Sequence, residues 1–179
     1  VNGALVFDER YLGKPLIYCG TGGIMPRISV GRKCELKEVE RGDRIFMIGG
    51  RIGKDGIHGA TFSSLALDES SPSSAVQLGD PITQKRVSDF LLEARDRGLY
   101  RCITDNGAGG LSSSVGEMAR LSGGAKLDVR QAKVKYAGLK PYELVVSESQ
   151  ERMTVAVPTS NVEIFKSLAD RRGVEWSDV

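Results

Sequence analysis

Residues 105–114 combine a carboxylate with small residues in an order that suits phosphate or metal binding. They read Asp-Asn-Gly-Ala-Gly-Gly-Leu-Ser-Ser-Ser and directly follow an apolar run. Free amides at the start of a helix attract anions, and a carboxylate oxygen suits a hard cation such as Mg²⁺. Asp105 is therefore a candidate Mg²⁺ ligand. The alternative is that Asp105 only caps a turn or a helix, and the residue types leave both interpretations open.

A second segment is rich in glycine. Five of the eleven residues 49–59 are glycine, and Arg51 and Lys54 lie among them, as in a loop that cradles phosphate. The Walker pattern is not met, because Ile48 occupies the position of its first glycine and Asp55 that of its Ser or Thr. No helix start follows directly, as a dinucleotide-binding loop requires. A ligand-contacting loop and a purely structural turn both remain open.

A third segment, residues 147–152, places the polar run Ser-Glu-Ser-Gln-Glu-Arg before an apolar stretch. Such a row of hydrogen-bonding groups suits a small polar ligand, although a solvated loop has the same composition. Nothing near the single histidine, His58, marks a hydroxyl group as an activated nucleophile. Three scattered cysteines and one histidine do not suggest a zinc site, so free thiols in a reduced cytoplasm are expected.

Composition indicates a packed, water-soluble protein. The chain has 179 residues, enough for one domain with an appendage, and 40% of them are hydrophobic and 27% charged. Mean hydropathy is −0.19 and no long apolar run is present, which argues against a membrane span. The net charge of +2 gives no sign of a nucleic-acid or membrane partner. We therefore expect a cytoplasmic protein.

Apolar periodicity and capping residues predict the helices that position these segments. Asp80 and Pro81 start a helix that ends at Gly98. Its buried face comprises Ile82, Val87, Phe90, Leu91 and Ala94. A second helix is expected from near Leu111 to Gly123. Its buried face comprises Leu111, Val115, Met118 and Ala119.

Strands are expected around these helices. They cover residues 44–48, 100–104, 125–134 and 153–157. A capping box over residues 160–163 starts a last helix that ends at Gly173, with Val162, Phe165, Leu168 and Ala169 inward. A further strand is expected to begin at Val174. This alternation predicts an α+β fold in which a mixed β-sheet is covered by helices.

Residues 1–41 differ from the rest of the chain. The apolar pieces 4–7 and 16–19 are separated by Gly and Pro, which suggests two or three small strands with no helix to cover them. Such strands cannot bury a core alone and are expected to seek partners, so a homodimer is one expected outcome. A domain boundary is expected between Arg41 and Gly42.

Together and in this order, these motifs resemble the phosphoribosylformylglycinamidine synthase family, the large amidotransferase subunit of purine biosynthesis. Each motif is modest alone, whereas the set in register is specific. The matching stretches span most of the chain from Gly42 to Val157. They are residues 49–53, 55–64, 76–81, 105–114, 141–143 and 147–153.

The resemblance implies an ATP-dependent ligase, which phosphorylates the amide oxygen of formylglycinamide ribonucleotide and replaces the phosphate with ammonia from a glutaminase subunit or domain. It implies that residues 42–179 resemble the C-terminal domain of aminoimidazole ribonucleotide synthase, truncated at its end. Residues 1–41 would be the tail of a preceding ATP-binding-type domain. By motif match, Asp105 would bind Mg²⁺. The residues implied to bind the nucleotide substrate are Gln77, Glu148, Ser149 and Gln150.

The sequence departs from the family pattern at Asn106, where relatives often have Met or Leu, and at Gly109, where Ala is common. The family's catalytic histidines and first ATP lysine lie upstream of this chain, and His58 belongs to a structural motif. The resemblance therefore implies a fragment that is inactive by itself. The alternatives are a domain of another enzyme of the same ATP-dependent superfamily, of the aminoimidazole ribonucleotide or selenophosphate synthetase type, and a non-catalytic phosphate-ligand binding module.

Overall fold

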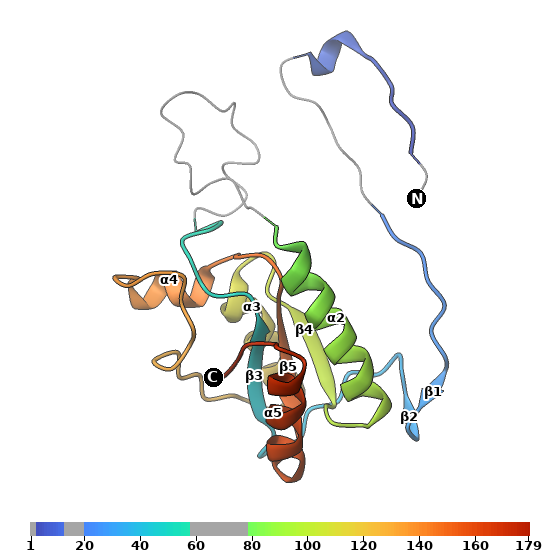
Figure 1. The fold of residues 1–179 in the computed structure, drawn as a ribbon, viewed down its shortest axis with the longest axis vertical. Helices are drawn as coiled ribbons and strands as arrows, with labels where there is room; N and C mark the ends of the chain where they lie inside the picture. Colours follow the sequence, from blue (N-terminus) through green and yellow to red (C-terminus); the bar gives the residue numbers. More distant parts are fainter. Residues whose placement is uncertain (1–2, 13–19, 58–78) are drawn as a thin grey trace.

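The computed structural model describes residues 3–12, 20–57 and 79–179. Within them a four-stranded sheet forms the centre of the molecule (Figure 1). Its strands are β3 (Arg44–Gly49), β4 (Cys102–Asp105), β5 (Arg152–Val157) and β6 (Trp176–Asp178). They lie in the order β4–β5–β3–β6. The four corresponding strands predicted from the sequence are confirmed, with each start within two residues of its expected position.

The α+β class is confirmed, but each neighbouring pair in the sheet is antiparallel, so the expectation of a mixed sheet was wrong. In the described part of the chain, parallel pairing is limited to an isolated bridge between Ile52 and Val134. The strand expected over residues 125–134 was also wrong, because this segment is a loop. The segment packs over the core and meets the edge strand β6 only through isolated contacts, such as the hydrogen bond from the amide of Lys133 to the hydroxyl of Ser177 at 3.1 Å.

Helices cover both faces of the sheet. The helices α2 (Pro81–Asp96) and α5 (Val162–Arg171) pack on one face, and α3 (Gly110–Ser122) and α4 (Pro141–Val146) on the other. Successive side chains of a strand point to opposite faces, so Phe46 packs with α2 and α5 whereas Met47 packs with α3. Burial on both sides explains the unbroken apolar run of β3 and the largely apolar sequence of β5.

The core under α2 and α5 is built around aromatic rings. The ring centroid of Phe46 lies 5.3 Å from that of Phe165, which in turn lies 5.0 Å from Phe90 in an edge-to-face arrangement. Trp176 approaches Phe46 edge-on at 5.9 Å. Aromatic pairs of this kind contribute about 0.5–1.5 kcal/mol each beyond the area that they bury. They join two helices and two strands into one unit.

The start of α2 forms as predicted. The carboxylate of Asp80 accepts hydrogen bonds from the amides of Ile82 (3.0 Å) and Thr83 (3.1 Å), and Pro81 is the first helical residue. The buried face contains Val87, Phe90 and Ala94, with Leu91 partly buried. The prediction for Ile82 was wrong, because its side chain is 64% exposed. Ile82 lies five residues before Val87, which on an α-helix rotates it by roughly 140° from Val87 and so away from the buried face.

The other two predicted helices are present with one correction. In α3, Leu111, Val115 and Met118 are buried as expected, and a left-handed Gly123 ends the helix at a φ of +81°. The capping box expected for α5 is absent. The short 3₁₀ turn η3 (Thr159–Asn161) precedes the helix instead, Asn161 makes no side-chain cap hydrogen bond, and Glu163 pairs with Lys166 at 3.1 Å.

The described residues among the first 41, which are 3–12 and 20–41, add little regular structure. They contain the 3₁₀ turn η1 (Glu9–Tyr11) and a small hairpin of β1 (Ile28–Ser29) and β2 (Arg32–Lys33). The strand expected over residues 4–7 was wrong, because these residues do not form a strand and the side chains of Leu5, Val6 and Phe7 are exposed. The second expected piece, residues 16–19, lies outside the described residues. The described part of the chain contains no helix long and apolar enough to cross a membrane.

Gly49 offers a direct test of how the sheet meets the loop before β5. It has a φ of +96°, and a Cβ atom there would lie 2.1 Å from the carbonyl oxygen of Glu151. Gly49→Ala is therefore expected to lower the free energy of unfolding by about 2 kcal/mol or more, measured by urea denaturation.

The matched control is Gly116→Ala within α3, where a Cβ atom would meet nothing within 4 Å. This variant is expected to raise the free energy of unfolding by up to about 1 kcal/mol, because alanine is the better helix former. Equal stability of Gly49→Ala and the unsubstituted protein would show that the contact at Glu151 is not tight.

Candidate functional site

A cleft of about 430 Å³ lies where the end of β4 meets the start of β5. The two strands are antiparallel with Asp105 opposite Met153, so the loop after β4 and the loop before β5 emerge at the same edge of the sheet. One side of the cleft is formed by α2 through Gln84, Val87, Ser88 and Leu91. Four of the residues implied by the family resemblance line the cleft, namely Asp105, Glu148, Ser149 and Gln150. The fifth, Gln77, lies outside the described residues.

Asp105 is exposed at the end of β4. Its Oδ1 atom accepts a hydrogen bond from the amide of Gly107 at 2.8 Å, so the side chain holds the turn that leads into α3. The turn-capping role that the sequence left open is therefore present. It uses one carboxylate oxygen, while the group itself stays at the surface of the cleft.

Two amides at the start of α3 are already used within the protein. The amide of Gly109 donates to Oε1 of Glu148 at 3.1 Å, and the amide of Gly110 donates to the carbonyl oxygen of Gly107 at 2.9 Å. A protein carboxylate thus already lies at the positive end of the helix, which is a favourable position for negative charge. Glu148 packs so closely that a Cβ atom on Gly56 would lie 2.6 Å from its own Cβ.

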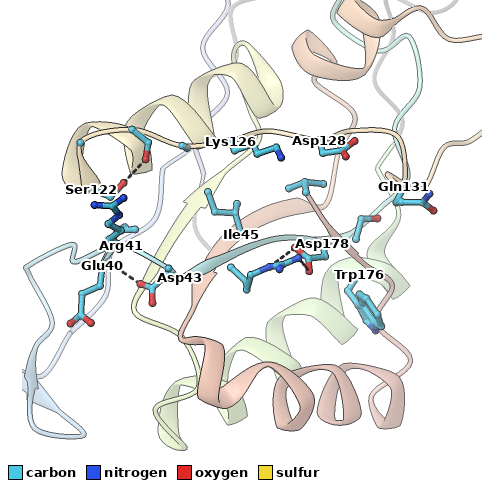
Figure 2. A pocket seen from close by; sticks show the side chains of 18 of the residues that line it. Glu40, Arg41, Asp43, Ile45, Ser122, Lys126, Asp128, Gln131, Trp176 and Asp178 are labelled. Atoms are coloured by element: carbon cyan, nitrogen blue, oxygen red, sulfur yellow. Dashed lines mark hydrogen bonds and ion pairs between the residues drawn. The ribbon is translucent and has the colours of Figure 1, made fainter.

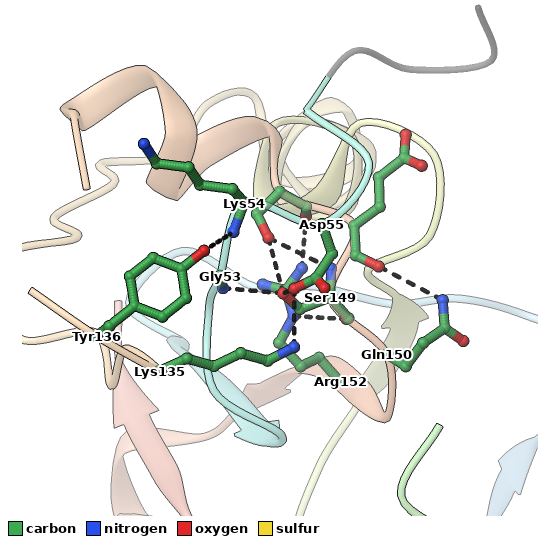
Figure 3. Close-up of polar contacts among 10 residues, drawn as sticks. Gly53, Lys54, Asp55, Lys135, Tyr136, Ser149, Gln150 and Arg152 are labelled. Atoms are coloured by element: carbon green, nitrogen blue, oxygen red, sulfur yellow. Dashed lines mark hydrogen bonds and ion pairs between the residues drawn. The ribbon is translucent and has the colours of Figure 1, made fainter. Parts of the chain in front are cut away.

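Ser149 and Gln150 differ in what their side chains can reach. Ser149 is 2% exposed, accepts a hydrogen bond from the amide of Gly53 at 2.9 Å and donates to Oδ2 of Asp55 (Figure 3). Gln150 is exposed, and its Nε2 atom lies 3.5 Å from the carbonyl oxygen of Glu148. Of these two neighbours, Gln150 is therefore the one with an exposed side chain at the cleft.

Asp55 belongs to the glycine-rich segment and connects it to the cleft. Its carboxylate pairs with Nζ of Lys135 at 2.8 Å and accepts the hydroxyl hydrogen bond of Ser149. Burial acts to raise the pKa of Asp55, but the hydrogen bonds from Lys135 and Ser149 outweigh it and hold the pKa below its ordinary value. The carboxylate is therefore ionised at neutral pH. The sequence left open whether this segment contacts a ligand or forms a purely structural turn. At Asp55 the structure shows contacts within the protein, to Lys135 and Ser149.

Arg152 is a buried cation that the residue-type analysis did not single out. It is 3% exposed, and its guanidinium donates to the carbonyl oxygens of Ser149 (Nε, 2.8 Å) and Ser147, with Sδ of Met47 at 3.6 Å. Burial lowers the pKa of Arg152 to about 10, with the charge of Asp55 opposing that shift, so the group remains charged at neutral pH. The sequence signal for this residue was an arginine directly before an apolar strand. That signal does not reveal burial, which depends on how the loop and the sheet pack together.

A second polar network lies beneath the cleft. Oδ1 of Asn106 accepts hydrogen bonds from the hydroxyls of Ser114 (2.8 Å) and Thr154 (3.0 Å), and these two hydroxyls lie 3.0 Å apart. All three side chains are buried. The network joins α3 and β5 to the turn that carries Asp105. The sequence signal was a threonine inside an apolar strand, which is typical of a buried hydroxyl with a partner.

Two other hollows are present among the described residues. One of about 500 Å³ adjoins the cleft, sharing Val87, Gln150 and Glu151 with it. The larger one, of about 1490 Å³, lies at the opposite end of β3 and carries charges of both signs, including the ion pair between Arg44 and Asp178 (Figure 2). None of the four described candidate residues lines the larger hollow.

The donor set at the cleft suits only part of a Mg²⁺ coordination shell. The described residues contain no group of three His, Cys, Asp or Glu side chains that could hold a metal ion. Asp105 and Glu148 both border the cleft. Mg²⁺ commonly keeps several waters and takes one or two carboxylates together with phosphate oxygens of a substrate. The residues present fit that mode of binding, with Asp105 as the exposed carboxylate.

Comparison with known proteins places this geometry in a family. Residues 40–179 match the family described as AIR synthase related protein, C-terminal domain. The chain belongs to this family. The sheet with helices on both faces is therefore the fold of an AIR-synthase-related C-terminal domain.

The whole chain, which includes this AIR-synthase-related domain, has similar curated relatives. It is 37% identical over 180 residues to phosphoribosylformylglycinamidine synthase subunit PurL of Thermoplasma volcanium, covering 99% of this chain and 23% of that protein. It is 39% identical over 176 residues to the same subunit of Staphylococcus aureus, covering 97% and 24%. The family resemblance inferred from the motifs is confirmed. The chain spans about a quarter of the length of these relatives.

Solved structures give the same result. PurL of T. maritima complexed with FGAR superposes with a TM-score of 0.71 and 31% identity, over 80% of this chain and 24% of that one. The same protein complexed with ATP gives a TM-score of 0.65 and 26% identity, over 79% and 22%. The matched part of the chain therefore corresponds to about a quarter of a larger protein in each case.

Because the pKa of Asp55 is lowered in the folded protein, the contribution of Asp55 to the free energy of unfolding should depend on pH. A carboxylate whose folded pKa lies below its unfolded value of 3.8 stabilises the fold above that pH, and the contribution is lost as the pH falls through the folded pKa. Asp55→Asn is therefore expected to be less stable than the unsubstituted domain at pH 7. The difference is expected to shrink steadily below about pH 4.

The measurement is urea denaturation at a series of pH values between neutrality and about pH 2.5. Asp96→Asn serves as the control, because Asp96 is exposed and pairs with the neighbouring Arg95 on the surface of α2. It is expected to change stability little at any pH. A destabilisation by Asp55→Asn that stays constant down to the lowest pH would contradict the assignment of an ionised Asp55.

Proposed function

We propose that the chain is part of a phosphoribosylformylglycinamidine synthase, an ATP-dependent ligase. The whole enzyme would convert formylglycinamide ribonucleotide, ATP and glutamine-derived ammonia to formylglycinamidine ribonucleotide. The observation that supports this most directly is the convergence of Asp105, Glu148 and Gln150 on one cleft. They do so in a domain whose structural neighbour at 31% identity is PurL complexed with FGAR. The domain alone would be inactive and would supply part of the substrate surface.

We propose that residues 42–179 form the AIR-synthase-related domain of the first half of that enzyme, and that residues 1–41 are the tail of the domain before it. The exposed side chains of Leu5, Val6 and Phe7 support this division, because apolar groups of this size are normally covered in a folded protein. The covering surface would be the remainder of the parent chain, or a second copy if the protein is a homodimer. The glutaminase would be a further subunit or domain, and the enzyme would be cytoplasmic.

Gln150, Glu148 and Gln77 would contact the nucleotide substrate. The amide of Gln150 can both donate and accept hydrogen bonds, and the Glu148 carboxylate accepts them, which suits ribose hydroxyls and an amide. Ser149 belongs to the same set and would act through the position of the loop. Asp105 would hold Mg²⁺, which offsets phosphate charge during phosphoryl transfer from ATP. ATP use is supported by the relative that was solved with ATP.

Removing the exposed amide of Gln150 tests the substrate role. In the full-length protein that carries this chain, Gln150→Ala is expected to weaken binding of formylglycinamide ribonucleotide about 10-fold, because one or two hydrogen bonds are lost. Gln77→Ala is expected to act in the same direction. Isothermal titration calorimetry measures both affinities.

Gln131→Ala is the matched control, since this exposed glutamine lines the hollow at the far end of β3. Its affinity for the substrate is expected to equal that of the unsubstituted protein. If neither Gln150→Ala nor Gln77→Ala changes the affinity, the substrate does not occupy this cleft. Binding of inorganic phosphate or another nucleotide in its place would favour the alternative of a phosphate-ligand binding module.

The role of Asp105 is tested by the magnesium dependence of the reaction. Asp105→Asn removes the negative charge while keeping an oxygen for the Gly107 amide. It is expected to raise the Mg²⁺ concentration needed for half-maximal ATP turnover by about 10-fold or more. Asp89→Asn on the exposed surface of α2 is the control. An unchanged Mg²⁺ requirement in Asp105→Asn would assign Asp105 to the turn alone.

A further inference from the structure

Two of the residues proposed to face the ligand, Glu148 and Gln150, lie on a loop whose shape needs support. The loop links α4 to β5, and Glu151 within it has a φ of +57°, a left-handed conformation that is uncommon for residues other than glycine. Burial alternates along the loop, since Ser147 and Ser149 are buried, Glu148 is half-buried and Gln150 is exposed. The loop presents the latter two to the cleft only while the two serines stay buried.

The hydroxyl group of Ser149 is fully used inside the protein. A serine hydroxyl has one hydrogen to donate and two lone pairs to accept with. The hydrogen goes to Oδ2 of Asp55, the amide of Gly53 donates to the oxygen at 2.9 Å, and Oγ of Ser147 lies 3.1 Å away. With a side chain that is 2% exposed, Ser149 has no capacity left for a ligand in the cleft. Its contribution must come from where it holds the loop.

Asp55 contacts two consecutive residues of that loop. Its side chain accepts the hydroxyl hydrogen bond of Ser149, and its carbonyl oxygen accepts the amide of Glu148 at 2.8 Å. Lys135 fixes the Asp55 carboxylate through an ion pair of 2.8 Å, and the stem of the same lysine covers Gly53 (Figure 3). The glycine-rich segment and the loop are thereby joined at their backbones and side chains.

Arg152 holds the loop from inside the fold. Its planar guanidinium donates to the carbonyl oxygens of Ser147 and Ser149, the two buried positions. A guanidinium directs its donors in fixed directions, so it sets the orientation of both peptide groups. Ser149 is thus held by two residues. Asp55 binds its hydroxyl group and Arg152 binds its carbonyl oxygen.

We propose that Asp55 is a positioning residue for the cleft, which acts through the Ser149 hydroxyl and the Glu148 amide to hold Glu148 and Gln150 in ligand-binding orientation. Neither the family motifs nor the residue types assigned Asp55 a role at the cleft. The inference rests on the proposed function for the identity of the ligand, formylglycinamide ribonucleotide. The positioning itself can be measured without any ligand.

The experiment compares Asp55→Ala with the unsubstituted full-length protein by two readouts. Without ligand, hydrogen–deuterium exchange of the amides of Gly53 and Glu148 is expected to accelerate about 10-fold or more. Both acceptors, the Ser149 hydroxyl and the Asp55 carbonyl oxygen, remain in this variant, but they lose the hydrogen bond between the Asp55 carboxylate and Ser149 that holds them in place. In steady-state kinetics, KM for formylglycinamide ribonucleotide is expected to rise about 10-fold with a smaller change in kcat, because Asp55 does not touch the reacting atoms. A general loss of structure would instead accelerate exchange throughout the sheet.

Two further variants separate positioning from folding. Asp55→Asn keeps an oxygen that accepts the Ser149 hydroxyl, so it is expected to restore most of the exchange protection and of KM. Lys135→Met keeps the stem over Gly53 and removes only the partner of the Asp55 carboxylate. It is expected to shift both readouts in the same direction as Asp55→Ala, but less. Asp89→Ala, which breaks an exposed ion pair with Lys85, is the control and should leave both readouts unchanged.

The outcomes are distinguishable. Unchanged exchange at Gly53 and Glu148 in Asp55→Ala would overturn the proposal, as would accelerated exchange with an unchanged KM. If the unsubstituted protein neither binds nor converts formylglycinamide ribonucleotide, the proposed function fails. The exchange data then still decide whether Asp55 holds the loop, and an unchanged rate overturns that part independently.

Discussion

Close backbone approach at two glycines is the constraint on which the cleft depends. A Cβ atom at Gly49 would lie 2.1 Å from the carbonyl oxygen of Glu151, and one at Gly110 would lie 2.1 Å from that of Ser147. Both glycines also have positive φ angles, which residues with a side chain rarely adopt. Glycine is therefore needed at both positions for the backbone conformation as well as for the close approach. The loop before β5 is therefore clamped between the end of β3 and the start of α3. These two contacts fix the path of the loop, and Asp55 and Arg152 hold its residues within that path.

The pairing of β4 with β5 brings this loop next to the turn that carries Asp105. Because β4 and β5 are antiparallel neighbours, the turn with Asp105 and the loop with Gln150 leave the sheet at one edge. Helix α2 forms the adjacent wall, and the aromatic core beneath it keeps that wall against the sheet. The buried charge of Arg152 is satisfied mainly by carbonyl oxygens, which suits a guanidinium that orients a loop.

Much of the fold could be predicted from the sequence because its signals are local. The Asp80–Pro81 start of α2, the left-handed Gly123 after α3 and the apolar runs of β3 and β5 each act within a few residues. Residues 125–134 misled the prediction, because a loop that lies over a core alternates in the same way as a strand. The family motifs identified Asp105 and the residues 148–150, whose roles remain predictions. Asp55 could not be found from residue types, since its partner Ser149 lies 94 positions away along the chain.

The single tryptophan of the chain has a practical consequence. Trp176 lies on the edge strand β6 against Phe46, its indole nitrogen donates to Asp170 at 2.9 Å, and the ammonium group of Lys166 lies 5.2 Å from the ring centroid. A half-buried indole with these neighbours has an environment that exists only while β6, β3 and α5 are assembled. Its fluorescence is therefore an intrinsic, label-free reporter of the integrity of the sheet, with no second emitter of its kind to confuse the signal.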